Sequence, residues 1–96
     1  MDFQALAPRV DEAAQLMGLL SQPARLKILC ILFEGEQSVL ALAKAVDLSQ
    51  PAMSHHLRKL RDANVVATRR DGQTIFYRLN GKEISAVLKV LHRLYC

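Results

Sequence analysis

The chain has 96 residues, a net charge of +4 and a hydrophobic fraction of 51%. This length suits one domain, residues 1–96, with enough apolar side chains for a core; the mild basic excess is compatible with a nucleic-acid partner but does not require one. No apolar run reaches the ~18 residues of a membrane helix. The N-terminal residues MDFQALAPRVDE lack the basic-then-apolar form of a signal peptide, so we expect a cytoplasmic protein with no membrane partner.

The first half of the chain predicts three helices. A narrow apolar stripe, with alternating spacings of four and three, runs along the first of them: Leu6, Val10, Ala13, Met17 and Leu20. Ser21 is expected to cap a second helix, Ala24–Glu34, with Pro23 in its first turn. That helix is apolar nearly all round and should be buried at the centre of the fold. Ser38 opens a short third helix, Val39–Val46.

The second half predicts a fourth helix, a hairpin and a last helix. Ser49 caps the fourth helix, whose apolar face carries Met53, His56, Leu57 and Leu60, and whose polar face carries Gln50, Pro51, Ser54, His55, Arg58, Arg61 and Asp62. Two β-rich runs, Val65–Arg70 and Thr74–Leu79, are joined across Asp71-Gly72, a hairpin signal. The last helix, Glu83–Tyr95, has one apolar face: Ile84, Val87, Leu88, Leu91 and Tyr95. The order ααααββα predicts a mainly α fold with a small β-wing, a winged helix-turn-helix.

A helix that follows a short turn and precedes a basic hairpin is typical of a DNA reader. An isolated charged helix face would more often be only solvated. Three side chains at the start of the fourth helix are expected to meet base edges: Gln50, Ser54 and His55. Arg58 is expected at phosphates, as is Arg61. Pro51 either contacts a thymine methyl or is an ordinary first-turn proline, and Arg69 and Arg70 are expected at the wing tip, near the minor groove or its phosphates.

The apolar stripes of the first and last helices predict a homodimer. Burying each other across a two-fold axis, they would present two recognition helices about one DNA turn apart, which matches a palindromic operator. The alternative is that both helices only cover the core of their own protomer.

Other functional classes have little support in the sequence. His55 and His56 are adjacent on a helix and diverge, so they make a poor metal pair. His56 is instead expected to be a hydrogen-bonded packing residue. We expect no metal site and no cofactor. We also expect no enzymatic activity, because no nucleophile, base and acid combine and no phosphate loop is present.

Three segments, QPARLKIL at 22–29, LSQPAMSHHLRKLRDANVV at 48–66 and RRDGQTIFYRL at 69–79, resemble the ArsR/SmtB family of bacterial winged-helix repressors. The resemblance implies DNA contacts at Gln50, Ser54 and His55, with Pro51 at a neighbouring position, and at the wing arginines Arg69 and Arg70. Many members of the family sense metals. Here the segment 38–44 has no cysteine, and Glu83 and His92 lie nine residues apart on different helix faces, so we do not expect metal sensing at the familiar sites.

The segments around the two cysteines, KILCIL and LHRLYC, resemble those of the subgroup that contains the sulfide-responsive repressors SqrR and BigR and the regulator HlyU. The resemblance implies that Cys30 and Cys96 form a dithiol that senses reactive sulfur species or oxidants, and that cross-linking them releases operator DNA. Three alternatives remain. The cysteines are a core residue and an incidental terminal one, the chain is an HlyU-like activator that displaces a silencing protein, or it is a metal-responsive repressor or zinc store using both cysteines and a histidine.

Overall fold

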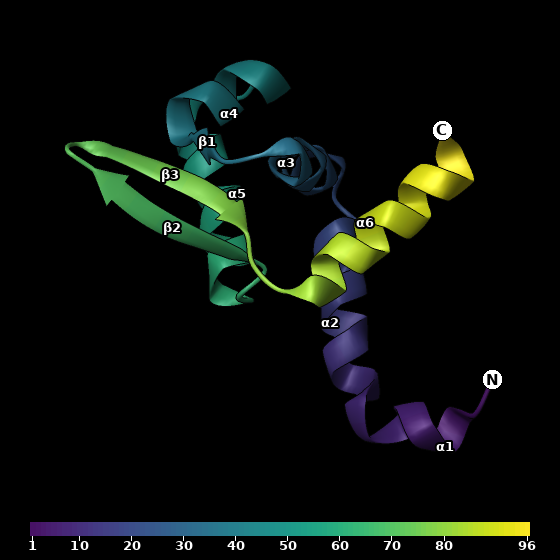
Figure 1. Cartoon of the computed structure of the whole chain (residues 1–96). Coiled ribbons are helices and arrows are strands. Elements are labelled where there is room, and N and C mark those ends of the chain that lie inside the picture. The colour runs from purple at the N-terminus through teal and green to yellow at the C-terminus, as the bar shows by residue number, and fades with distance from the viewer.

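The computed structural model describes residues 1–96 and contains six α-helices, one 3-10 helix and one three-stranded antiparallel sheet (Figure 1). In chain order the elements are α1 (Phe3–Leu6), η1 (Ala7–Arg9), α2 (Val10–Leu20), α3 (Pro23–Glu34), β1 (Gln37–Ser38), α4 (Val39–Val46), α5 (Gln50–Asp62), β2 (Val66–Asp71), β3 (Thr74–Leu79) and α6 (Lys82–Tyr95). The predicted mainly helical fold with a β-wing is confirmed.

The N-terminal segment is not the single helix that the sequence predicts. It is divided into α1, η1 and α2, and Figure 1 shows α1 turned away from the axis of α2. Pro8 lies in the short 3-10 helix between them, where it lacks an N–H and its ring excludes a continuous α-helix. No single helix is long and apolar enough to span a membrane. Phe3–Leu20 and Pro23–Glu34 pass by length and composition only as a pair, and that pair is bent by 95°.

The connection between α2 and α3 corrects the prediction for Ser21. Its hydroxyl donates to the carbonyl oxygen of Gly18 at 2.7 Å, so Ser21 completes the end of α2. The N-cap of α3 is Gln22, which makes no capping hydrogen bond through its side chain, and Pro23 occupies the first turn as predicted. A serine between two helices can donate to the helix before it or accept from the helix after it, and here it donates to the free carbonyl oxygen of Gly18 in α2.

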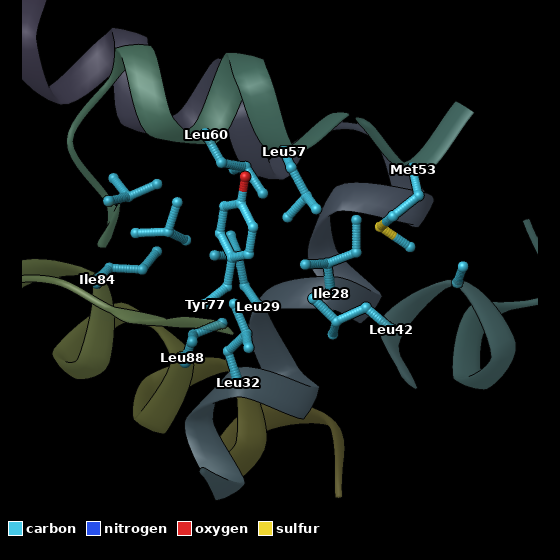
Figure 2. Packing of buried hydrophobic residues seen from close by; sticks show 13 residues of the cluster. Ile28, Leu29, Leu32, Leu42, Met53, Leu57, Leu60, Tyr77, Ile84 and Leu88 are labelled. Atoms are coloured by element: carbon cyan, nitrogen blue, oxygen red, sulfur yellow. The ribbon is translucent and has the colours of Figure 1, made fainter. Parts of the chain in front are cut away.

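The core surrounds α3, as the sequence predicts. Thirteen buried hydrophobic residues form one cluster, and Figure 2 shows Ile28, Leu29 and Leu32 of α3 at its centre. Helix α5 contributes Met53, Leu57 and Leu60, while α6 contributes Ile84 and Leu88. Replacing one of these leucines by alanine would remove on the order of 2–5 kcal/mol of stability, so both flanking helices are firmly fixed against α3.

The turn between α4 and α5 sets the position of the predicted recognition helix. Ser38 and Ser49 cap the two helices as predicted, accepting from the N–H groups of Ala41 at 3.1 Å and Ala52 at 3.3 Å. Asp47 ends α4 in the left-handed region, with φ of 56°, a conformation that Asp tolerates better than most residues. The chain therefore reverses within three residues and α5 begins at Gln50.

The wing is a regular hairpin, and Figure 1 shows it projecting away from the helices. The pairing of β2 with β3 runs from Val66 opposite Leu79 to Asp71 opposite Thr74. The turn is therefore Gly72-Gln73, one residue later than predicted, and Gly72 has φ of 63°. A third strand, β1, pairs with the other side of β3. The sequence did not predict it, because two residues carry no readable alternation.

Candidate nucleic-acid interface

Helix α5 is buried on one face and open on the other. Met53 and Leu60 are 0% exposed and Leu57 is 1% exposed. The predicted DNA-contacting residues of this helix all lie on the exposed face: Gln50, Pro51, Ser54, His55 and Arg58. The structure thus brings these five side chains to one surface, supported from beneath by the core.

His56 lies on the inner margin of α5, as predicted, but the predicted hydrogen bond is missing at one nitrogen. Its Nδ1 is buried and has no hydrogen-bond partner. Burial lowers the pKa of this imidazole, and the neighbouring Arg25, His55 and Lys59 lower it further. The surroundings of His56 therefore favour the neutral form of its imidazole.

A cleft of about 460 Å³ separates the second half of α5 from the wing. It is lined by Ser54, Arg58, Arg61, Asp62 and Tyr77. Neither arginine takes part in an ion pair, since the two ion pairs of the chain join Arg9 to Glu12 and Arg69 to Glu36. Sequence reasoning did not identify Tyr77 as part of this surface, because the alternation of β3 assigns it only to the buried side of the sheet.

The two wing arginines differ in their surroundings. The Nη2 of Arg69 lies 2.7 Å from Oε1 of Glu36 in the α3–β1 connection, and its guanidinium stands 4.4 Å from the ring centroid of Phe76. The hydrogen bond to Arg69 lowers the pKa of the Glu36 carboxyl. Arg70 is exposed and has no ion-pair partner. Both precede Asp71, which closes the hairpin, so they lie beside the turn rather than on it.

Cys30 and Cys96 are free thiols, and both residues are exposed. Cys30 therefore lies outside the core that its neighbours Ile28, Leu29 and Leu32 build, which removes its interpretation as a core residue. Partial burial of the sulfur raises the pKa of the Cys30 thiol, and the nearby Cys96 raises it further.

Metal ligands do not gather in this chain. No group of three or more His, Cys, Asp or Glu side chains is close enough to hold a metal ion. Glu83 and His92 lie at opposite ends of α6, about 13 Å apart along the axis at ~1.5 Å per residue.

A second surface carries apolar side chains that the protomer leaves exposed. On the N-terminal helices these are Phe3, Leu6, Val10 and Met17, and at the end of α6 they are Val90, Leu94 and Tyr95. The predicted apolar face of α6 is divided: Ile84 and Leu88 are buried in the core of their own protomer, whereas Tyr95 is 81% exposed. The alternative that α6 covers its own core therefore applies to the first half of that helix.

Comparisons with known proteins identify similar chains. The sequence model of a family described as "Bacterial regulatory protein, arsR family" matches residues 22–68, from the start of α3 into β2. The chain is 41% identical to "Transcriptional activator HlyU" of Vibrio cholerae over 96 residues, which cover 100% of this chain and 89% of the relative.

Solved structures also include chains with a similar fold. The transcriptional repressor BigR of Xylella fastidiosa matches with a TM-score of 0.93 and 36% identity, over 100% of this chain and 98% of that one. A homodimeric winged helix-turn-helix DNA-binding domain from Mycobacterium bovis, described as a possible ArsR-family transcriptional regulator, matches with a TM-score of 0.83 and 28% identity, over 92% and 82% of the two chains.

Proposed function

The chain belongs to the ArsR family of bacterial regulatory proteins, and we propose that it is a homodimeric transcriptional repressor that reads a palindromic operator in double-stranded DNA with α5. The observation that carries this proposal is the division of α5 into a fully buried face and an exposed polar face. The buried side fixes the helix, so its polar side can enter a major groove without rearrangement of the chain.

The side chains on α5 have separate roles in this proposal. Gln50, Ser54 and His55 offer donors and acceptors to base edges, and Pro51 packs beside them. Arg58, one turn beyond Ser54, contacts phosphate and fixes the register. Arg70 on the wing contacts phosphates that flank the minor groove. Arg69 reaches DNA only if it leaves Glu36.

The apolar surfaces of the N-terminal helices and of the end of α6 support the homodimer, because exposed apolar patches in soluble proteins mark interaction sites. The Mycobacterium bovis domain is described as homodimeric. A two-fold axis here presents two copies of α5 to successive major-groove turns, about 34 Å apart.

Fluorescence anisotropy tests the readout, with a duplex selected from a random-sequence pool by the wild-type protein and an unrelated duplex for comparison. Ser54→Ala or His55→Ala is expected to weaken binding to the selected duplex by roughly three- to thirtyfold and to leave the unrelated duplex nearly unaffected. Arg70→Ala should weaken both and reduce the salt slope by ~0.9 per protomer. Lys89→Ala, an exposed lysine of α6, is the control. Unchanged preference in the Ser54 and His55 variants would mean that α5 is not the reader.

We further propose that Cys30 and Cys96 form a dithiol switch for reactive sulfur species or oxidants. They are the only cysteines of the chain, both are exposed and free, and Cys96 is one cause of the raised pKa of the Cys30 thiol. A bridge between them joins α3, on which α5 packs, to the end of α6, beside the exposed apolar surface. Such a bridge shifts the reading helices relative to the dimer interface and releases DNA.

The chemistry needs a two-electron oxidant, which the inducer supplies. One cysteine thiolate attacks the outer sulfur of a persulfide, R–S–SH, and releases R–SH, which leaves a protein persulfide. The second thiolate attacks the inner sulfur of that persulfide, closes the disulfide and expels hydrogen sulfide. An oxidant reaches the same disulfide through a sulfenic acid and loss of water. A direct disulfide requires Cα atoms within about 7 Å, and a polysulfide bridge relaxes that limit.

Intact mass and DNA anisotropy, measured on the same reduced and polysulfide-treated samples, test the switch. Wild type is expected to lose affinity as its mass changes by loss of two hydrogens for a direct disulfide, or by loss of two hydrogens and gain of the bridging sulfur atoms for a polysulfide. Cys30→Ser and Cys96→Ser should bind DNA when untreated and stay bound after treatment. Release from Cys30→Ser on polysulfide treatment would refute the dithiol.

A second candidate function is transcriptional activation by displacement of a silencing protein, which the relative named as an activator favours. A reporter with and without the silencer separates the two. An activator loses its effect when the silencer gene is deleted, whereas a repressor still represses.

A further inference from the structure

Tyr77 is a buried residue whose hydroxyl has no hydrogen-bond partner within the chain. It is 8% exposed, and Figure 2 shows its ring within the core and its hydroxyl oxygen directed toward α5. No other group of the chain hydrogen-bonds this hydroxyl, and it is not sealed from water, since the one sealed side-chain atom without a partner is Nδ1 of His56. The hydroxyl therefore opens into the cleft between α5 and the wing.

The position of Tyr77 is rigid. It lies on the central strand β3, where it pairs with Thr68 of β2 on one side and Gln37 of β1 on the other. A donor fixed on both sides by a sheet loses little conformational freedom when it binds a ligand.

The opposite wall of the cleft is basic. Ser54, Arg58 and Arg61 follow one another at spacings of four and three on α5, so they share one face. The two guanidinium groups outnumber the single carboxylate, Asp62, at the edge, and neither guanidinium has an ion-pair partner. The cleft thus combines cationic and neutral donors around a volume of about 460 Å³.

We propose that this cleft holds one phosphodiester group of the DNA backbone, with the Tyr77 hydroxyl donating to it from the wing and Arg58 and Arg61 from α5. The inference rests on the proposed DNA-binding function and adds Tyr77 to its contacts. The occupant is a phosphate rather than a base, because the only aromatic ring of the cleft is packed in the core and offers no face for stacking. Contacts to one phosphate from both β3 and α5 fix the wing relative to the reading helix.

The test compares Tyr77→Phe, which keeps the buried ring, with Arg61→Gln and with the control Lys89→Gln. Affinity for the selected and the unrelated duplex is measured between 50 and 200 mM salt. Tyr77→Phe is expected to weaken both complexes by roughly three- to tenfold without changing the salt slope, because no charge is removed. Arg61→Gln should weaken both and reduce the slope by ~0.9 per protomer. The double variant should lose less than the sum, since both groups hold the same phosphate.

A methylphosphonate scan of the selected duplex identifies the phosphate and keeps the test independent of the folding of Tyr77→Phe. One neutralised position should weaken wild type strongly and Arg61→Gln less, because Arg58 and Tyr77 still contact that phosphate in the variant. The cleft assignment would be overturned if Tyr77→Phe bound DNA as wild type does, or if no methylphosphonate position lost part of its effect in Arg61→Gln. The Ser54 and His55 variants would still support DNA reading in that case. The cleft would be assigned to free phosphate if inorganic phosphate competed with DNA more strongly than chloride does at equal ionic strength, and if no methylphosphonate position in the duplex weakened binding. Failure of the wild type to prefer any duplex would instead remove the proposed function itself.

Discussion

At the scale of single residues, His56 shows how packing sets chemistry. Helix periodicity predicts its place on the inner margin of α5, but the sequence could not reveal that Nδ1 would lack a partner. Arg25, whose charge acts on His56, has its own partners: it donates to the carbonyl oxygen of Leu19 at 2.9 Å and to that of Gly18 at 3.4 Å. Which polar groups find partners depends on tertiary geometry that no local pattern encodes.

The lowered pKa of His56 predicts acid sensitivity of the fold. The folded chain favours the neutral imidazole, whereas the unfolded chain takes up a proton near the ordinary value of 6.5. The His56 contribution is therefore complete above pH 6.5 and is lost as the pH falls from 6.5 toward the lowered pKa. Thermal unfolding at pH 8 and 5.5 should show a larger loss of Tm for wild type than for His56→Leu, with His92→Gln as the control. Equal losses in wild type and His56→Leu would contradict this assignment.

At the scale of elements, the sequence predicted those that their own residues specify. The helices from α3 to α6 match expectation within one or two residues, because their apolar spacing, and the serine caps of α4 and α5, act within a few turns. The wing also appeared with a one-residue shift at its turn. The misses have other causes: Pro8 divides a helix whose apolar stripe continues across the break, and β1 exists only through its pairing with Phe76 and Tyr77 of β3.

The sequence likewise predicted only part of the candidate site. The exposed residues of α5 follow from helix periodicity, which assigns each position to a face. The engagement of Arg69 with Glu36 and the opening of Tyr77 toward α5 both bring together segments distant in sequence. Only the folded chain reveals such contacts.

The tie between Glu36 and Arg69 predicts that DNA affinity is restrained by this ion pair. Glu36→Gln removes the carboxylate and frees the Arg69 guanidinium for phosphate. Both duplexes should bind more tightly, and the magnitude of the salt slope should rise by up to ~0.9 per protomer. Glu34→Gln is the matched control, because it removes the same charge from an exposed residue without an ion pair. Equal gains in DNA affinity in the two variants would mean that only the change in net charge matters and that the Arg69 guanidinium remains over the Phe76 ring.

At the scale of the whole molecule, the proposed DNA-reading surface and the proposed dimer interface lie on opposite sides of the protomer. Figure 1 shows the wing projecting on one side and both chain termini on the other. The exposed apolar side chains of α1, α2 and the end of α6 lie toward the termini, whereas Leu16, Leu19 and Leu20 turn inward onto the core. An interface at the termini leaves α5 and the wing free in each protomer.

This arrangement predicts that a charge on the terminal surface separates the protomers without unfolding them. Met17 is 51% exposed, so Met17→Glu should cost a protomer little, but burying an unpaired carboxylate in the dimer should weaken association at least about tenfold. Gln15→Glu introduces the same charge at another exposed position of α2 and is the control. Sedimentation velocity reports the assembly state, and anisotropy on a two-half-site duplex reports the consequence. Dissociation removes the second reading helix, so Met17→Glu should bind a duplex with one half-site about as well as wild type and lose most of the gain from the second. A Met17→Glu protein that sediments and binds as wild type does would place the interface elsewhere.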